Sequence, residues 1–290
     1  MLITAAIISG LGLGSMYGLI ALGYHVTYVV SNTVNFSQGS AMMLGAVLGY
    51  AFGVRLGWPL PLAMLTALVL CALFGLVVER LLVRPFAERG SNAWLMATVA
   101  GGIVLENAVL FTFGKEPRSF PSVLAVKPVS VFGAGVYPLQ LVIPVAGLCI
   151  AVLLHLVFHR TRIGKALLAV VQNPDAARLM GINVRSAIAA SFAVSTVLAG
   201  VAGLLIAPLF SVHSEMGTLF GIKAFAVAIL GGITSAWGVV LAGLVYGLIE
   251  ALVTTFFGSV YTQIVAFSVV ILALAALPNG LLGRAAINKV

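Results

Sequence analysis

The chain has 290 residues, of which 62% are hydrophobic and only 8% are charged, and its formal net charge is +8. Soluble domains carry roughly 25% charged residues, so this composition excludes an ordinary soluble enzyme or binding module. The basic residues cluster in links between long apolar runs, which argues for a membrane protein and against nucleic acid as a partner.

The apolar runs predict membrane-spanning helices, because a helix satisfies every backbone polar group inside a bilayer. We expect spans near 4–24, 36–53, 60–80, 93–113, 138–158, 187–208, 219–234, 238–257 and 260–278. The run 219–234 is short and ends at two glycines, and the stretch 32–39 is polar for membrane depth. The sequence therefore predicts an all-α polytopic integral membrane protein, one transmembrane domain over 1–290, with eight or nine spans and one of them short or broken.

Polar side chains inside the predicted spans are costly and mark candidate functional sites. The stretch NFSQG either lines a transport pathway, where unwound backbone is common, or simply satisfies a break in a helix. The candidate pathway residues are Asn35, Ser37, Gln38, Glu106, Asn107, Lys223 and Glu250.

Three of these candidates are charged and lie at similar depth. Glu106 and Glu250 each sit about seven residues from the outer end of a span, which is roughly 10 Å at 1.5 Å per residue. Lys223 enters the short run from the same side, so it is predicted to pair with either Glu106 or Glu250. Glu106 has an alternative, in which burial protonates it and it hydrogen-bonds a neighbouring helix.

The link 114–137 is predicted to be an external loop. Its segment PVSVFGAGVYPLQ alternates apolar residues around Gly133 and Gly135, a weak hairpin pattern. A small β-hairpin and an irregular cap are both compatible with this pattern.

The link 160–185 interrupts the apolar pattern with five basic residues and the signals of a short helix. Asn173 is a suitable N-cap, Pro174 suits the first helical position and Gly181 suits a left-handed stop. Asp175 and Arg178 lie at the helix ends that favour their charges. Two turns of helix are unstable in water, so this helix is predicted to pack against another part of the chain or another protein.

The distribution of Lys and Arg predicts the orientation, because basic residues concentrate on the cytoplasmic side. In the nine-span arrangement, ten of the 15 basic residues share one side: Arg80, Arg84, Arg89, Arg160, Arg162, Lys165, Arg178, Arg185, Arg284 and Lys289. The C-terminus is then cytoplasmic and the N-terminus external, and 160–185 is a cytoplasmic loop between spans five and six.

Four segments resemble the permease subunits of branched-chain amino acid ABC transporters, most closely the shorter, H-type permease of the pair. The sharpest is RTRIGKALLAVVQNPDAARLMGINV, which is similar to the family's cytoplasmic loop. The others are MYGLIALGYHVTYVVSNTVNFSQGSAMMLGA (16–46), KAFAVAILGGITSAWGVVLAGLVYGLIEAL (223–252) and PNGLLG (278–283). They span nearly the whole chain in the family's order.

The resemblance implies a transport subunit, not an enzyme, that forms half of a translocation pathway in a bacterial inner membrane. It implies a second homologous permease, two cytoplasmic ATPases that bind ATP and Mg²⁺, and an external substrate-binding protein. In such systems a short cytoplasmic helix sits in a cleft of the ATPase. Residue matching places that role on Asn173, Pro174, Asp175, Ala176, Ala177, Arg178, Leu179, Met180 and Gly181, with Arg162, Gly164 and Lys165 shaping the approach.

The sequence itself contains no nucleotide-binding or catalytic motif. Gly164-Lys165 is followed by Ala166 and lacks the upstream glycine of a phosphate-binding loop. His155 and His159 share a helix face but lack a third ligand, which makes a poor metal site. We therefore expect no cofactor or metal on this chain.

Two questions stay open at this point. A proton-coupled secondary carrier, with Glu106 and Glu250 taking up and releasing protons, is the alternative to an ATP-driven importer. The resemblance implies a branched-chain amino acid or a related small polar solute as cargo; relatives of this family also move urea, short amides or aromatic acids, and nothing in the predicted spans distinguishes among these. Family members often carry Gln at the position of Glu106, which argues against a required charge there.

Overall fold

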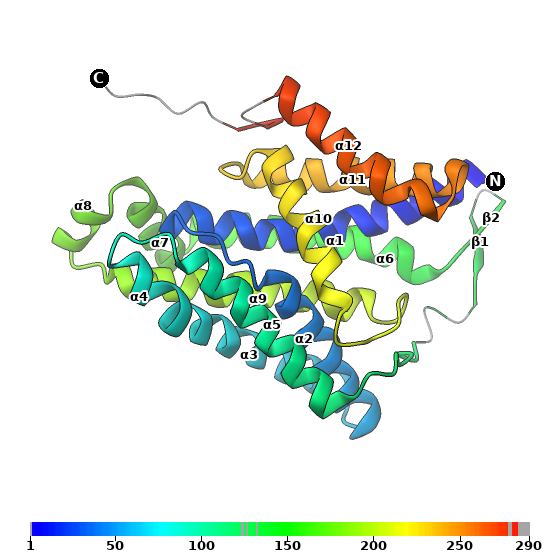
Figure 1. Ribbon diagram of the computed structural model, residues 1–290, viewed down its shortest axis with the longest axis horizontal. Helices are drawn as coiled ribbons and strands as arrows, with labels where there is room; N and C mark the ends of the chain where they lie inside the picture. The colour runs from blue at the N-terminus through cyan, green and yellow to red at the C-terminus, as the bar shows by residue number, and fades with distance from the viewer. Residues whose placement is uncertain (1, 123–124, 126, 132, 278–279, 284–290) are drawn as a thin grey trace.

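The computed structural model describes residues 2–122, 125, 127–131, 133–277 and 280–283, and it is almost entirely helical (Figure 1). Arg284 and Lys289 of the predicted cytoplasmic tail lie outside the described residues. The helices are α1 (Leu2–Ser31), α2 (Gln38–Tyr50), α3 (Leu60–Val77), α4 (Arg84–Ala87), α5 (Trp94–Phe113), α6 (Pro138–Arg160), α7 (Arg162–Gln172), α8 (Pro174–Leu179), α9 (Val184–Ile206), α10 (Met216–Gly231), α11 (Ala236–Phe257) and α12 (Ser259–Ala276). Two π-helical segments, Ala51–Arg55 and Val78–Val83, continue α2 and α3.

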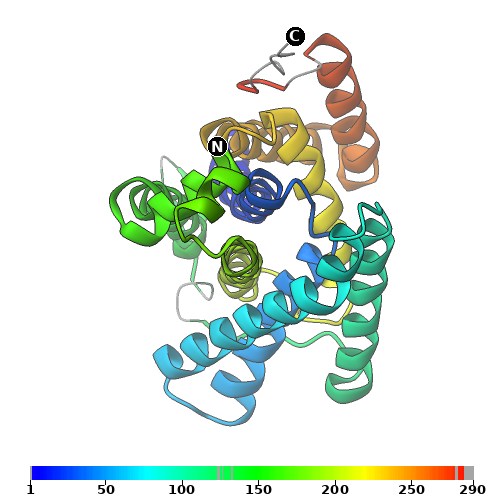
Figure 2. The same ribbon diagram turned by 90° about the vertical axis from the view of Figure 1, so that its left-hand side faces the viewer.

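Helix α1 is the centre of the bundle and packs against α6, α9, α10 and α11 (Figure 2). Its contact with α11 is backbone against backbone: a Cβ on Gly14 would lie 2.6 Å from the carbonyl oxygen of Gly243. Close approach through small residues is the usual way in which membrane helices associate, because lipid supplies no hydrophobic drive between them. Any side chain at Gly14 or Gly243 would force the two central helices apart.

Each of the nine apolar runs coincides with a helix in the described residues. Within the part of the chain that the structure describes, six helices are long and apolar enough to cross a bilayer: Leu2–Ser31, Leu60–Ala87, Trp94–Phe113, Pro138–Arg160, Val184–Ile206 and Ala236–Phe257. The 16 residues of α10 span about 24 Å, less than a hydrocarbon core of about 30 Å, so its short length agrees with the sequence. The total of eight or nine crossings stays a prediction.

Two helices extend beyond their predicted ends because their polar side chains form hydrogen bonds with nearby groups of the same helix. Helix α1 continues past residue 24 to Ser31, and the hydroxyls of Thr27 and Ser31 donate to carbonyls four residues back, at 3.3 and 2.8 Å. The third run continues past residue 80 to Ala87. There the buried Glu79 carboxylate accepts two hydrogen bonds from the guanidinium of Arg84, at 2.9 and 2.7 Å.

The link 114–137 contains a short antiparallel hairpin, the first of the two forms compatible with its sequence. Strand β1 (Val129–Val131) pairs with β2 (Ala134–Val136), with Val129 opposite Val136. The same link is tied to the segment before α10, since Arg118 and Val212 exchange two backbone hydrogen bonds. This hairpin lies at one end of the bundle, beside the N-terminus (Figure 1).

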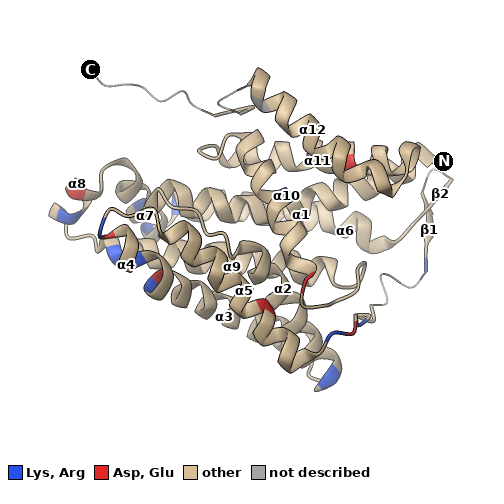
Figure 3. Ribbon diagram, in the orientation of Figure 1, with Lys and Arg blue, Asp and Glu red and all other residues tan. Residues whose placement is uncertain are grey.

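Charged residues gather at the opposite end, around α4, α7 and α8 (Figure 3). An ion pair of 2.9 Å joins Arg185 at the start of α9 to Glu88 after α4. The two basic links between spans therefore lie at the same end of the molecule, as the sequence predicted for one side of a membrane. Which side is cytoplasmic stays a prediction.

Candidate functional site

The short helix predicted in the link 160–185 is present as α8. The side-chain oxygen of Asn173 accepts hydrogen bonds from the backbone N–H groups of Asp175 and Ala176, both at 3.0 Å. Gly181 ends the segment with φ +81°, the left-handed conformation that glycine adopts at little cost. Residues 173–181 thus form a capped turn of helix whose boundaries follow from local sequence.

One face of α8 is anchored to the rest of the molecule. Ala177 is only 3% exposed and joins a small apolar cluster with Val30, Leu167, Val170 and Val184. This cluster supplies the packing that so short a helix needs.

Helix α7, which was not predicted as a separate element, packs against α8 through the same apolar cluster. The Thr161 hydroxyl caps it by accepting the N–H of Gly164 at 3.0 Å. A Cβ on the buried Gly164 would lie 2.5 Å from the Cα of Phe158, so glycine permits the tight turn from α6 into α7. Glycine at this position thus has a structural role in the turn, and its predicted role in ATPase coupling stays a prediction.

The outer face of α8 is solvent-exposed and partly apolar. Leu179 is 89% exposed and Met180 is 82% exposed. Beside them, Asp175 and Arg178 form an exposed ion pair at 3.0 Å, and the side chains of Arg162 and Lys165 are also exposed. An apolar tip ringed by charge is typical of a protein-docking surface.

The polar stretch after α1 forms a tightly bonded helix break. The side-chain oxygen Oδ1 of Asn35 accepts hydrogen bonds from the Ser37 backbone N–H at 3.1 Å and from the Ser37 hydroxyl at 2.6 Å. The Gln38 amide donates to the Ser195 carbonyl at 2.8 Å. All three side chains are fully buried. Their geometry favours the second of the two alternatives, a satisfied break, and a pathway role for them stays a prediction.

Lys223 pairs with Glu250 rather than with Glu106. Its ammonium lies 2.6 Å from Glu250 Oε1, and each side chain is only 10% exposed. An unpaired charge within a span costs about 2.5–3.5 kcal/mol on insertion scales, and pairing offsets part of this cost. The two residues come from α10 and α11, so the pair joins neighbouring helices in the half of the bundle far from α8.

The surroundings of this pair are polar but incompletely bonded. The Tyr17 hydroxyl lies 3.5 Å from the Lys223 ammonium. Among the described residues, neither Glu250 Oε2 nor the Tyr246 hydroxyl has a hydrogen-bond partner. Lys223 and Glu250 border a partly open cavity of about 390 Å³ between α1, α10, α11 and α12.

Glu106 lies on the other side of α10. One of its carboxylate oxygens accepts hydrogen bonds from Ser40 at 3.0 Å and Thr218 at 2.9 Å, and Glu106 borders a separate cavity of about 360 Å³. Asn107 is exposed and donates to the Ile103 carbonyl at 2.8 Å, away from this cluster. The structure therefore separates the predicted polar positions into two sites and a helix break.

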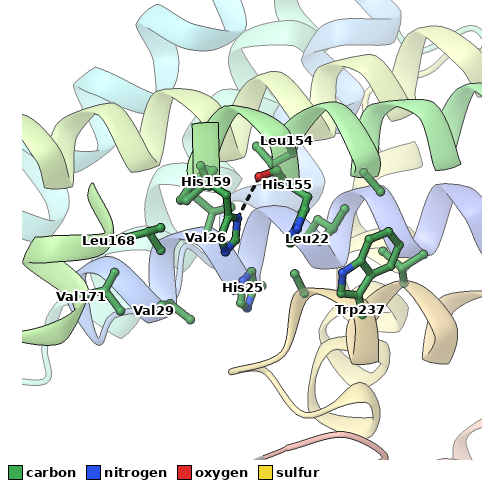
Figure 4. Close-up of a pocket in the computed structure, with 14 residues that line it drawn as sticks. Leu22, His25, Val26, Val29, Leu154, His155, His159, Leu168, Val171 and Trp237 are labelled. Atoms are coloured by element: carbon green, nitrogen blue, oxygen red, sulfur yellow. Dashed lines mark hydrogen bonds between the residues drawn. The ribbon is translucent and has the colours of Figure 1, made fainter. Parts of the chain in front are cut away.

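Three of the four histidines meet at a third, mainly apolar cavity of about 90 Å³ (Figure 4). The rings of His155 and His159 stack with centroids 4.1 Å apart, and His25 Nδ1 lies 2.7 Å from the Ile233 carbonyl. Among the described residues no group of three His, Cys, Asp or Glu side chains is arranged to hold a metal ion.

Sequence reasoning missed four residues of the two polar sites: Tyr17, Ser40, Thr218 and Tyr246. Tyr246 precedes Glu250 by four residues, so helical spacing places both on one face and could have identified it. The other three reach their partners across helix interfaces, for which the local sequence holds no signal.

The sequence profile described as "Branched-chain amino acid transport system / permease component" matches residues 6–274. The chain is 32% identical to the high-affinity branched-chain amino acid transport system permease protein LivH of Escherichia coli K12, covering 97% of this chain and 96% of that protein. It is 34% identical to the corresponding permease BraD of Pseudomonas aeruginosa, covering 98% and 97%. It is 27% identical to the autoinducer 2 import system permease LsrD of Salmonella paratyphi B, covering 80% and 71%.

The fold is also similar to a chain of PsaBC from Streptococcus pneumoniae, solved in complex with Fab. The TM-score is 0.50 at 14% sequence identity, covering 93% of this chain and 90% of that one. At this identity the similarity concerns the fold alone.

Proposed function

We propose, from the premise that this chain belongs to the permease-component family of branched-chain amino acid transport systems, that it forms half of the pathway of an ATP-driven importer. The chain is a multi-pass membrane protein. A second homologous permease completes the pathway, two cytoplasmic ATPases bind ATP and Mg²⁺, and an external binding protein delivers a branched-chain amino acid or a related small solute. The membrane is the bacterial inner membrane, with the C-terminus inside and the N-terminus outside.

The observation that carries this proposal is the exposed tip of α8. The helix is anchored through Ala177, while Leu179 and Met180 extend into solvent at 89% and 82% exposure. Large apolar side chains at such exposure are unfavourable in water and favour a protein partner. A cleft in the ATPase is the occupant that the family membership supports, and closure of that cleft would move α8 together with α7 and α9.

The alternative, a proton-coupled carrier using Glu106 and Glu250, has less support. The relatives are permease components of transport systems, and none of their names describes proton coupling. The two carboxylates border different cavities on either side of α10, and Glu250 is paired with a lysine.

The proposal is tested by Leu179→Asp in proteoliposomes that contain the complete transporter and its external binding protein. A charge at the tip of α8 should prevent its insertion into an apolar cleft. We expect at least a tenfold loss of ATP-dependent leucine uptake, with normal amounts of permease in the membrane.

The matched control is Asn92→Asp, which adds the same charge at an exposed position in the other basic link. Its uptake should match that of the unmodified protein. Full uptake by Leu179→Asp, or uptake by the permease without any ATPase, would refute the proposal.

A further inference from the structure

Helices α6 and α11 both pack against α1, but they have little contact with each other. Gly147 of α6 lies close to Ser15 of α1, and Gly14 on another face of α1 lies against α11. Figure 4 shows α1 between α6 and α11. A strip of α1 between the two helices is therefore left partly uncovered.

Two apolar cavities lie in succession along this strip. The histidine cavity of about 90 Å³ is the one that α7 also borders, and a cavity of about 140 Å³ continues from it. The two share Leu22 and Val240, so together they form one groove, which we call the α6–α11 groove. From Leu11 to Val29 of α1 it extends about 27 Å, at 1.5 Å per residue. One leaflet of the hydrocarbon core is about 15 Å thick, so the groove is long enough to hold an acyl chain.

Unbonded polar side chains occur only at the α7 end of the groove. In the deeper cavity the Ser15 hydroxyl donates to the Leu11 carbonyl at 2.8 Å, and the other lining side chains are apolar. At the α7 end, the ring of His155 and the indole N–H of Trp237 have no hydrogen-bond partner within the described chain. Both side chains are directed toward the histidine cavity (Figure 4).

The α7 end of the groove also carries positive charge. Lys165 precedes the cavity-lining Leu168 by three residues, so both lie on one face of α7. Lys165 is exposed and has no ion-pair partner in the residues that the structure describes, and no Asp or Glu lines either cavity. Trp237 is the second residue of α11, and Trp at a helix end is typical of the level at which lipid headgroups lie.

We propose that the α6–α11 groove binds one anionic phospholipid. An acyl chain lies along α1, and the phosphate lies at the α7 end. There the N–H groups of His155 and Trp237 donate to the phosphate oxygens, and the Lys165 ammonium lies close to their negative charge. This inference goes beyond the proposed function, because it depends neither on the cargo nor on the source of energy for transport.

The size and polarity of the groove distinguish a phospholipid from other occupants. A helix with its side chains is about 10 Å wide, and cavities of about 90 and 140 Å³ do not admit one. A free phosphate would leave the long apolar part of the groove unfilled. A small polar solute would meet only apolar or already bonded side chains in the deeper cavity. An anionic phospholipid matches both parts, since its chain is apolar and its charge is at one end.

The proposal is tested by photolabelling the complete transporter in phosphatidylcholine nanodiscs. The probe is phosphatidylglycerol with a photoreactive diazirine in one acyl chain, present as a small fraction of the lipid. The comparison probe is phosphatidylethanolamine with the same acyl chain, which carries no net charge. Labelled residues are identified by peptide mass spectrometry, with and without an excess of unlabelled phosphatidylglycerol.

We expect phosphatidylglycerol to label the groove segments of α1, α6 and α11 about fivefold more than phosphatidylethanolamine, the preference that one basic residue supplies for an anionic lipid. Unlabelled phosphatidylglycerol should remove this labelling. Trp237→Phe and His155→Leu should each lower it about threefold, because each removes one hydrogen bond to the phosphate. The matched control Trp58→Phe removes an indole N–H outside the groove and should leave the labelling unchanged.

Two results would overturn the inference. Equal labelling of the groove by the two probes would show that the groove does not recognise a negative charge. Absence of label from the groove in the complete transporter would show that another subunit, not a lipid, covers it. Both results are obtained with the unmodified protein, so neither depends on the folding of a variant.

Discussion

The two halves of this molecule hold ion pairs in opposite environments. Near α8, Asp175 and Arg178 lie 3.0 Å apart with side-chain exposures of 83% and 63%. In the other half, Lys223 and Glu250 lie 2.6 Å apart with 10% exposure each. The distances are similar, but the first pair is surrounded by water and the second is mostly buried between helices.

Exposure therefore decides what each pair contributes. An exposed pair adds about 0–1 kcal/mol to stability, so its charges are free to serve recognition by a partner. In a buried pair each charge strongly stabilises the other. Removal of one charge is therefore strongly destabilising, because the other stays buried without a counter-charge. A substitution in the α8 pair should consequently change function with little change in stability, whereas a substitution in the buried pair should change both.

The largest expected effect is from Lys223→Met, which leaves Glu250 buried without its counter-charge. We expect a loss of about 3–5 kcal/mol in the free energy of unfolding, measured by SDS titration of the purified permease. The double variant Lys223→Met/Glu250→Leu should recover most of that stability, because it removes both charges. Equal losses in the single and the double variant would show that the pair is not coupled.

A smaller effect is expected from Glu106→Gln on the other side of α10. The Gln side-chain oxygen can still accept from Ser40 and Thr218, so the change in stability should stay within about 1 kcal/mol. Leucine uptake should remain within a factor of about two for the same reason. A loss of uptake beyond tenfold would show that the negative charge of Glu106 is required.

The smallest effect on stability is expected from Asp175→Asn, at a mostly exposed position. The unfolding free energy should change by less than about 0.5 kcal/mol, since the pair with Arg178 is screened by water. ATP-dependent uptake should nevertheless fall at least tenfold, because the charge lies on the proposed docking surface. A stable variant with normal uptake would confine docking to Leu179 and Met180.

Local sequence predicted the helices and the capped segment 173–181 well. Asn173 caps α8 through its own side chain, and Gly181 ends the segment through its own backbone conformation. The nearby sequence was therefore enough to predict both ends of the segment. The apolar runs likewise located every long helix. Their ends were less predictable, because Thr27 and Ser31 continue α1 by bonding to their own backbone rather than stopping it.

Contacts between helices could not be predicted in the same way. Equal depth allowed Lys223 to pair with Glu106 or with Glu250, and only the packing of α10 against α11 distinguished the two. Ser40 and Thr218 reach Glu106 from α2 and α10, which are distant in sequence. The polar stretch at Asn35, Ser37 and Gln38 was equally ambiguous, since the same side chains can line a pathway or complete a break.

The most direct measurement is thiol labelling of Leu179→Cys in a Cys149→Ser background with a membrane-impermeant maleimide. Right-side-out and inverted membrane vesicles are compared, with the ATPases present and after their removal. We expect labelling only in inverted vesicles stripped of the ATPases, and protection when the ATPases are bound again. Labelling from the external side, or unchanged labelling with the ATPases bound, would contradict the assignment of α8 as the contact through which ATP hydrolysis drives this permease.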